Sequence, residues 1–342
     1  MMASNTTKPC LGFDFGGVYM KLALTDKKGI SRIIVEEFPE GIFKDGDIIA
    51  PNSALVLMRE VLKKHRVKAK ECAFILPPGK VLFRQLSTPV MDAHQIRKNL
   101  PFEFRDLISG KKEDYFFDYA IGSYQKNADG EVTGLNLMIS AVQRKNMEAY
   151  IRFFNKLGIK LRVAAPLESA FSNIIRTYEA NHLDVSEGSD YCFLDIGHSA
   201  TRIHLYSGPL FQATRVIEYG GAMVESAIAR DLNIELSAAR AYKENSQEAT
   251  RYLKETSTAY TSIALEIRKA VNFYSSNEKE MRKIETIYCC GGGGWMTPLL
   301  DTIREGAGLE IRPITELLPP NRNDAEGGLN LIGAVAVGIT LQ

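Results

Sequence analysis

The chain has 342 residues, of which 45% are hydrophobic and 24% are charged, a balance typical of a folded globular protein rather than a disordered one. Its 42 basic and 41 acidic residues nearly cancel, so the net charge gives no indication of a nucleic-acid partner or of binding to an anionic membrane. Five cysteines at irregular spacing, with no CxxC pair, indicate neither a disulfide framework nor a zinc site.

The first part of the chain predicts three strands followed by a helix. Strands are expected over Leu11–Phe15, Val18–Leu24 and Ser31–Phe38, because these runs are apolar and rich in β-forming residues. Gly16–Gly17 separates the first two strands. The apolar spacing within Ser53–His65 then predicts an amphipathic helix.

The middle of the chain has a periodicity of its own, in the order ββαββαβ. The elements expected in that order are Glu71–Leu76, Val81–Ser87, Asp92–Ser109, Tyr115–Tyr124, Glu131–Val142, Asn146–Leu157 and Ile159–Val163. Pro101 predicts a kink in the first of the two helices, because proline removes a backbone N–H. The order indicates a small α+β subdomain, residues 71–163, inserted into the first half of the chain.

The strand–glycine–strand–turn–strand plan returns in the second half. Strands are expected over Tyr191–Ile196, Thr201–Tyr206 and Leu210–Ile217, with Gly197 between the first two. Gly220–Gly221 then opens a predicted helix. Two copies of one unit indicate a duplicated α/β architecture with two lobes.

The rest of the chain is predicted to be mainly helical. The expected elements are helices within Ala222–Met281, a strand over Ile284–Cys289, a helix over Met296–Glu305 and a terminal helix over Leu329–Leu341. The longest apolar run, Leu331–Leu341, is too short to span a bilayer, and the N-terminus lacks the features of a signal peptide. We therefore expect a cytoplasmic protein that does not insert into a membrane by itself.

The first glycine loop carries residues suited to a phosphate site. Asp14, Gly16, Gly17 and Lys21 lie on or between two predicted hairpin strands, whereas a dinucleotide-binding loop or a P-loop would be followed by a helix. Glycines let backbone N–H groups reach phosphate oxygens, an aspartate can hold Mg²⁺ through water, and a lysine can contact the terminal phosphates. The alternative is a glycine turn between core strands beside a solvated lysine.

The second loop repeats this constellation and favours the functional interpretation. Asp195, Gly197 and Thr201 provide an acidic strand end, a glycine and a polar residue at the start of the next strand. Two such loops facing each other would hold a polyphosphate and its metal from both sides, with Asp14 and Asp195 facing the metal. His198 lies in the same loop and is expected to face solvent, without a chemical role.

A third constellation follows the last predicted strand. Gly291, Gly292, Gly293 and Gly294 lie in a row before a helix. A turn without Cβ atoms lets the backbone lie against a flat base, and the helix N-terminus offers N–H groups to a phosphate or ribose. Structural turns rarely need four consecutive glycines, so a nucleotide-binding role is favoured here.

Taken in this order, the three elements resemble the phosphate-1, phosphate-2 and adenosine motifs of the actin, Hsp70 and hexokinase superfamily. Within it the chain is most similar to the PilM family of type IV pilus assembly, and more distantly to the FtsA family of cell division. The similarity covers nearly the whole chain and includes residues 74–104, 113–123, 137–171 and 264–274. It implies a duplicated actin-like, ribonuclease H-like fold that binds ATP with Mg²⁺ between its lobes.

The resemblance assigns roles to residues one by one. Asp14, Gly16, Gly17 and Lys21 match phosphate 1; Asp195, Gly197 and Thr201 match phosphate 2; Gly291, Gly292 and Gly293 match the adenosine turn; and Gly220 and Gly221 match the pair beside the nucleotide. Together with the repeat, the resemblance predicts a first lobe at 1–70, 164–188 and 325–342, the insert at 71–163, a second lobe at 189–221 and 282–324, and a helical subdomain at 222–281.

Four positions bear on catalysis and on nucleotide affinity. Glu168 matches the acidic residue that often orients the attacking water, although an acid near a helix N-terminus also has a capping role. With the metal-facing Asp195 it completes the catalytic candidates. Lys243 matches a lysine that meets the base and ribose, but Arg240 replaces the expected glutamate, which puts the tightness of nucleotide binding in question.

The resemblance also implies a partner and a role. The partner is the cytoplasmic N-terminal tail of a PilN-like inner-membrane protein, held near the insert, so that the chain is recruited to the inner face of the membrane. Pilus motor or platform components and further copies of the chain are additional candidate partners. Besides a nucleotide-regulated scaffold with weak or no ATPase activity, a hexokinase-type kinase, an FtsA-like division protein and a scaffold unable to hydrolyse ATP stay open as alternatives.

Overall fold

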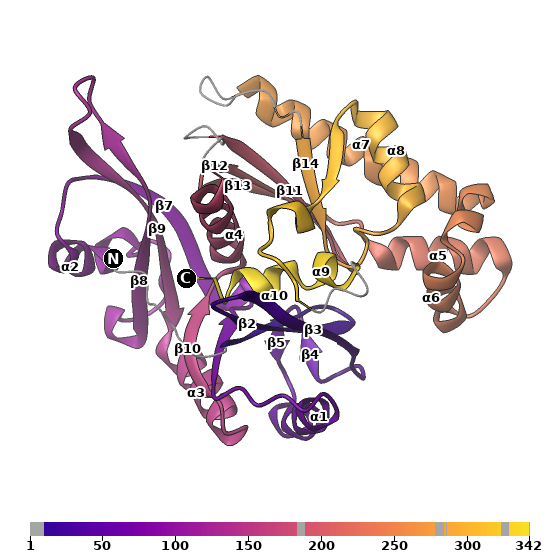
Figure 1. Cartoon of the computed structure of the whole chain (residues 1–342), viewed down its shortest axis with the longest axis horizontal. Coiled ribbons are helices and arrows are strands. Elements are labelled where there is room, and N and C mark those ends of the chain that lie inside the picture. Colours follow the sequence, from indigo (N-terminus) through magenta and orange to yellow (C-terminus); the bar gives the residue numbers. More distant parts are fainter. Residues whose placement is uncertain (1–9, 183–188, 278–283, 285, 323–327, 342) are drawn as a thin grey trace.

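The computed structural model describes residues 10–182, 189–277, 284, 286–322 and 328–341. Two five-stranded sheets form its two lobes (Figure 1). The first contains, in spatial order, β10 (Lys160–Ala165), β6 (Glu71–Ile75), β1 (Cys10–Phe15), β2 (Tyr19–Asp26) and β3 (Gly29–Glu37). The second contains β15 (Glu310–Pro313), β14 (Thr286–Cys290), β11 (Asp190–Ile196), β12 (Thr201–Ser207) and β13 (Leu210–Ile217).

The two sheets repeat each other strand by strand. In both, the three strands of the repeated unit pair antiparallel through two hairpins. A fourth strand (β6 or β14) then pairs in parallel with the first strand of the unit, and a fifth (β10 or β15) pairs in parallel with the fourth. A parallel neighbour requires a crossover connection, so the helices that follow each three-stranded unit lie against the sheets. The predicted duplicated, two-lobed α/β architecture is therefore confirmed.

The insert forms a separate three-stranded sheet. Its strands are β7 (Val81–Pro89), β9 (Val132–Gln143) and β8 (Tyr115–Lys126), and α2 (Ala93–Glu103) packs against them. Asp92 and Gln95 form a capping box at the start of α2, with Asp92 accepting from the N–H of Gln95 at 2.9 Å. Pro101 lies inside this helix, which ends earlier than expected.

The expected range of the insert, 71–163, differs from the observed pairing. β6 and β10 lie in the first large sheet, because β6 pairs with β1 and β10 pairs with β6. Helix α3 (Arg144–Lys156) also packs there, through Phe153 and Phe154. The sheet of the insert thus begins at β7 and ends at β9. The expected boundaries at 188, 281 and 324, and the segment before Cys10, lie outside the described residues.

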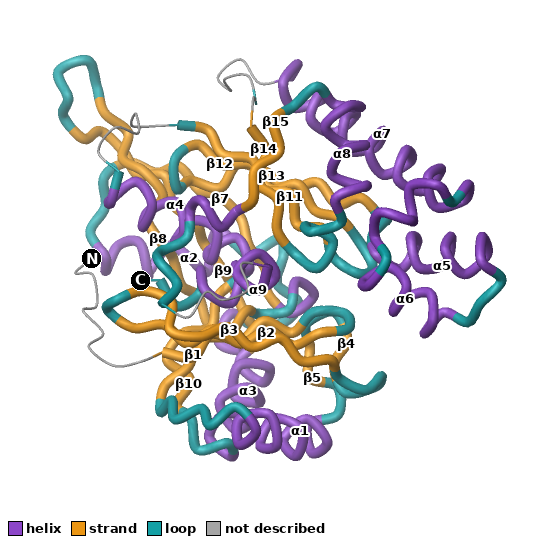
Figure 2. Tube along the Cα trace, turned by 45° about the vertical axis from the view of Figure 1, so that its right-hand side comes forward, coloured by secondary structure: helices purple, strands orange, loops and turns teal. Residues whose placement is uncertain are grey.

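The remaining elements cover the sheets and line the interface between the lobes (Figures 1 and 2). The first lobe adds β4 (Phe43–Lys44), β5 (Asp47–Ile48) and α1 (Pro51–Lys64), and the second adds α5 (Gly221–Leu232), α6 (Leu236–Asn245), α7 (Lys254–Asn277) and α8 (Thr297–Ala307). Short 3₁₀ helices are η1 (Pro78–Lys80), η2 (Lys112–Asp114), η3 (Gln247–Tyr252) and η4 (Ile314–Leu317). Among all these described helices, none is both long and apolar enough to cross a bilayer.

The C-terminal segment is two short helices rather than the single one expected. They are α9 (Gly328–Ile332) and α10 (Ala334–Gly338), and together with α4 (Leu167–Asn181) they lie between the lobes. A Cβ at Gly12 would lie only 1.9 Å from the carbonyl oxygen of Ala336, so glycine lets β1 and α10 pack directly together. This contact fixes the end of the chain beneath the first hairpin.

Candidate functional site

A cavity of about 680 Å³ opens between the two lobes. It is lined by the β1–β2 and β11–β12 hairpins, the first turn of α4, the inner faces of α5 and α6, and the glycine turn after β14. Most of the predicted site residues lie on this cavity: Asp14, Gly16, Gly17, Lys21, Glu168, Asp195, Gly197, Gly221, Lys243, Gly291, Gly292 and Gly293. The fold therefore gathers residues from five separate parts of the sequence, at 14–21, 168, 195–197, 221–243 and 291–293.

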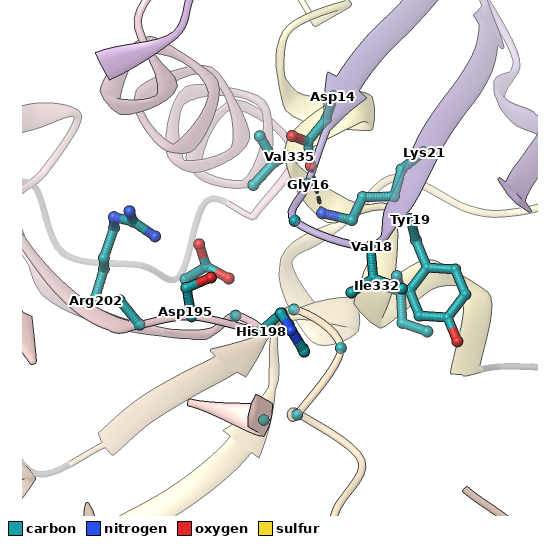
Figure 3. A pocket seen from close by; sticks show the side chains of 18 of the residues that line it. Asp14, Gly16, Val18, Tyr19, Lys21, Asp195, His198, Arg202, Ile332 and Val335 are labelled. Carbon is teal, nitrogen blue, oxygen red and sulfur yellow. Dashed lines mark hydrogen bonds and ion pairs between the residues drawn. The ribbon is translucent and has the colours of Figure 1, made fainter. Parts of the chain in front are cut away.

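The first hairpin places an acid and a base opposite each other. Asp14 and Lys21 are cross-strand partners of β1 and β2, and their side chains form an ion pair of 3.0 Å (Figure 3). The N–H of Gly16 closes the turn by donating to the carbonyl of Tyr19 at 2.9 Å. A Cβ at Gly16 would lie 2.8 Å from the Lys21 ammonium, so the loop is close to its own cation and has no space for a side chain.

The second hairpin repeats this geometry with a different cation. Asp195 and Arg202 are cross-strand partners of β11 and β12, in the places that Asp14 and Lys21 occupy in the first hairpin. The N–H of Gly197 donates to the carbonyl of Ala200 at 3.0 Å and closes the loop. Arg202 lines the cavity, and the sequence analysis missed it. Matching the two hairpins by spacing from their aspartates would have indicated this residue.

Thr201 does not take the role expected of it. Its side chain is fully buried, it does not line the cavity, and its hydroxyl has no hydrogen-bond partner among the described residues. Successive residues of a strand point to opposite faces, so Arg202 faces the cavity where Thr201 cannot. At the start of β12, the residue that lines the cavity is thus Arg202.

The two aspartates experience each other's charge. Burial raises the pKa of Asp195, Asp14 raises it further, and Lys21 and Arg202 oppose the shift. Burial alone would lower the pKa of Lys21, but Asp14 and Asp195 raise it above its ordinary value. Within the described ranges, no three His, Cys, Asp or Glu side chains come together as a metal site. Two carboxylates fit Mg²⁺ that arrives with phosphate and water ligands, because this ion needs few protein ligands.

The glycine turn after β14 packs against the second hairpin. A Cβ at Gly291 would lie 2.5 Å from a carboxylate oxygen of Asp195, and a Cβ at Gly293 would lie 2.2 Å from the Ile196 side chain. The N–H of Gly293 also donates to the carbonyl of Ile196 at 2.9 Å. Close packing therefore explains two of the glycines. A Cβ at Gly292 would meet nothing within 4 Å, so this residue leaves open space on the cavity wall.

Gly220 and Gly221 join α5 to the second hairpin. The N–H of Gly221 donates to the carbonyl of Gly197 at 3.0 Å, and the N–H of Ala222 donates to that of His198 at 2.8 Å. Gly221 lines the cavity, whereas Gly220 packs behind it, where a Cβ would lie 2.6 Å from the Gly197 oxygen. The pair thus positions the hairpin loop. The N–H groups of Gly221 and Ala222, at the start of α5, already donate to this loop.

A buried glutamate, which the sequence analysis also missed, organises the opposite end of the cavity. Glu225 on α5 is 3% exposed and accepts from Lys243 and from Arg240, the latter at 3.3 Å. Arg240 also reaches across the cavity to Glu37 of the first lobe at 3.0 Å. Glu225 thus places an acid beside Arg240 and Lys243. Glu225 could not be identified from the sequence, because an isolated glutamate on the buried face of a helix has no local motif.

Two further predictions concern His198 and Glu168. His198 does not simply face solvent: it lines the cavity with Nδ1 3.7 Å from Glu225, and burial lowers its pKa although Glu225 opposes this. Glu168 lies in the first turn of α4 and faces the cavity. Burial raises the pKa of Glu168, while Arg202 opposes the shift. Glu168 and Arg202 are therefore close enough to interact electrostatically.

Comparisons with known proteins agree with this geometry. The family model of the type IV pilus assembly protein PilM matches residues 12–319, and none of the curated proteins matches the sequence. The chain is similar to a solved PilM–PilN type IV pilus biogenesis complex, with a TM-score of 0.77, 19% identity and 97% of each chain covered.

Two other solved structures share the fold. One is the ethanolamine utilization protein EutJ from Carboxydothermus hydrogenoformans, with a TM-score of 0.59, 15% identity and coverage of 98% of this chain and 89% of that one. The other is MreB 5 of Spiroplasma citri bound to AMPPNP, with a TM-score of 0.54, 12% identity and coverage of 98% and 95%. These likenesses confirm the actin-like fold predicted from the sequence.

Proposed function

The chain belongs to the type IV pilus assembly protein PilM family, and from this premise we propose that it binds ATP with Mg²⁺ in the interlobe cavity and acts as a nucleotide-responsive scaffold of pilus assembly. The observation that carries the proposal is the pair of matching hairpins. Each presents a carboxylate and a cation to one cavity, from opposite lobes. MreB 5, a protein with a similar fold, was solved bound to AMPPNP.

The roles of the residues follow from their places on the cavity. We assign the polyphosphate to the space between the two glycine loops, which line the cavity from opposite lobes, and its Mg²⁺ to Asp14 and Asp195. Bound Mg²⁺ would neutralise phosphate charge. The turn at Gly291–Gly293, with Lys243 and Glu225, borders the space left for a nucleoside. A ligand that contacts both lobes favours the closed arrangement through its differential affinity for it.

The scaffold role requires a second, proteinaceous partner. We propose the N-terminal cytoplasmic segment of a PilN-like inner-membrane protein, since the fold matches a PilM–PilN complex. The insert carries exposed apolar side chains, among them Phe102 and Phe116, of which Phe116 stacks beneath Arg144 at 4.0 Å. Tyr115, at the start of the same strand as Phe116, is a core residue and is not available to a partner. Binding this segment would bring a cytoplasmic protein to the inner face of the membrane.

Calorimetric titration with ATP and Mg²⁺ tests nucleotide binding. Wild-type protein stripped of carried-over nucleotide is compared with Asp14→Ala and Asp195→Ala, and with Asp129→Ala in an exposed turn of the insert as the control. We expect each cavity variant to lose about tenfold or more in affinity, as for charge-assisted contacts, and the control to bind as wild type. Absence of binding by folded wild-type protein would overturn the proposal.

A further inference from the structure

The cations that line the cavity differ in whether they are neutralised. Lys21 pairs with Asp14 at 3.0 Å, Lys243 pairs with Glu225, and Arg240 pairs with both Glu225 and Glu37. Arg202 is half-buried in the same cavity, and its guanidinium has no hydrogen bond or ion pair with any residue in the described part of the chain. Among the described lysines and arginines that line this cavity, it alone forms no ion pair, although its charge acts on the nearby carboxylates of Glu168 and Asp195.

An unpaired guanidinium in a partly buried place has a physical cost. Its N–H donors lose part of their hydration without gaining an acceptor, which disfavours the ligand-free site. The hairpin itself does not supply the acceptor, because the cross-strand partner Asp195 is not within ion-pair distance. The planar fork of N–H donors matches the oxygens of a phosphate, which it can contact through two parallel hydrogen bonds.

The position of Arg202 indicates which phosphate it would meet. Glu225, Lys243 and Arg240 form a cluster at one end of the cavity. His198 lies beside this cluster, with Nδ1 3.7 Å from Glu225, and the charges of the cluster influence its pKa. Arg202 instead interacts electrostatically with Glu168 and Asp195. Figure 3 shows the Asp195 carboxylate between Arg202 and the Asp14–Lys21 pair, with His198 on the side away from Arg202. Arg202 therefore lies beyond the two hairpin carboxylates, away from the proposed nucleoside end.

The wall around Arg202 carries a second unsatisfied polar group. His204 lines the cavity from the same strand, is fully buried, and has an Nε2 atom with no hydrogen-bond partner among the described residues. Its Nδ1 lies 2.8 Å from the hydroxyl of Thr214, and burial lowers its pKa to about 3, so the ring is neutral. A neutral ring beside Arg202 adds no positive charge, and Arg202 is thus the cation available to an anion at this end.

We propose that Arg202 binds the terminal phosphate of a nucleoside triphosphate and thereby makes this site prefer triphosphate to diphosphate. The inference rests on the proposed nucleotide binding and deepens it. A diphosphate held by the hairpin loops and the glycine turn leaves Arg202 without its anion. A triphosphate supplies that anion, so the contact acts as a sensor of the terminal phosphate rather than as a general source of affinity.

Titrations with Mg²⁺–ATP and Mg²⁺–ADP, side by side, test the inference. The variants are Arg202→Gln and Arg202→Lys, with Arg215→Gln as a matched control, since Arg215 is exposed on the neighbouring strand β13 and does not line the cavity. We expect Arg202→Gln to weaken ATP binding about 10- to 100-fold, as for loss of hydrogen bonds to a charged group, and to change ADP binding less than about threefold. Arg202→Lys keeps the charge without the fork and should lie in between.

The possible outcomes separate the role of Arg202 in triphosphate preference from nucleotide binding itself. Equal weakening of ATP and ADP, or no change in either, by folded Arg202→Gln would overturn the inference while leaving nucleotide binding intact. Should that variant fail to fold, an unchanged ATP-to-ADP preference in Arg202→Lys would overturn it instead. Wild-type protein that binds neither nucleotide would overturn the proposed function, and the inference with it.

Discussion

The two hairpins that face the cavity share a backbone plan but satisfy their charges differently. In the first, Asp14 and Lys21 neutralise each other across the β1–β2 pair. In the second, Asp195 and Arg202 occupy the same places without forming an ion pair. The first hairpin therefore neutralises its own charges, whereas the second has a cation that forms no ion pair within the described residues. The two hairpins share their geometry but not their ion pairing, and the proposed ligand contact lies in the second lobe.

The hairpins also differ in what they hold. The loop of the first is closed by its own turn, at Gly16. The loop of the second accepts hydrogen bonds from the first turn of α5, through the carbonyls of Gly197 and His198. A phosphate that contacts the second loop thus acts on a segment joined to α5, and Glu225 on that helix joins α6 through Arg240 and Lys243. Binding at the second hairpin has a direct structural route to the helices of the second lobe.

The largest contrast is expected from replacing the two cations by an apolar side chain of similar length. Lys21→Met leaves the Asp14 carboxylate, whose side chain is 12% exposed, without its partner, and should lower the free energy of unfolding by about 2–3 kcal/mol. Arg202→Met removes a cation that forms no ion pair and acts on Asp195 and Glu168 only from a distance, and should lower the free energy of unfolding by less than about 1 kcal/mol. Denaturant unfolding without nucleotide measures both. Equal destabilisation by the two variants would remove the asymmetry.

A smaller contrast is expected from the glycines beside the loops. A Cβ at Gly220 would lie within 2.9 Å of three backbone atoms of the second loop, so Gly220→Ala should destabilise the protein by about 1–3 kcal/mol. Gly17→Ala in the first loop would meet only ordinary contacts, the nearest 3.4 Å from Cβ of His198, and should cost less than about 0.5 kcal/mol. Thermal unfolding of the two variants compares them. A Gly220→Ala variant as stable as wild type would show that the second loop is not fixed against α5.

The repeat could be predicted from the sequence because its signals are local. Each unit combines β-forming runs with a glycine break, and residues such as Asp14 and Asp195 lie at fixed places within it. The edges of the insert could not be predicted in this way. β6 and β10 look like the other strands of the middle region, and only the pairing of β6 with distant β1, and of β10 with β6, assigns them to the first lobe.

Residues that line the cavity could be predicted where a glycine-rich backbone motif marks them. They were missed where the direction of a side chain determines whether it reaches the cavity. Thr201 was expected at the site because it is polar and begins a strand, but the strand alternation turns Arg202 toward the cavity instead. Glu225 could not be identified because its role depends on how α5 and α6 pack. The substitution at Arg240 seemed to remove an acid from the site, yet the fold supplies one from the neighbouring helix.

The central claim is that both hairpins hold the phosphates of one nucleotide, and a crystal structure with Mg²⁺ and a non-hydrolysable ATP analogue tests it most directly. The account predicts the polyphosphate between the loops at Gly16–Gly17 and Gly197, the metal facing Asp14 and Asp195, and the terminal phosphate in contact with Arg202. An analogue bound outside the interlobe cavity, or bound to one hairpin alone, would contradict it.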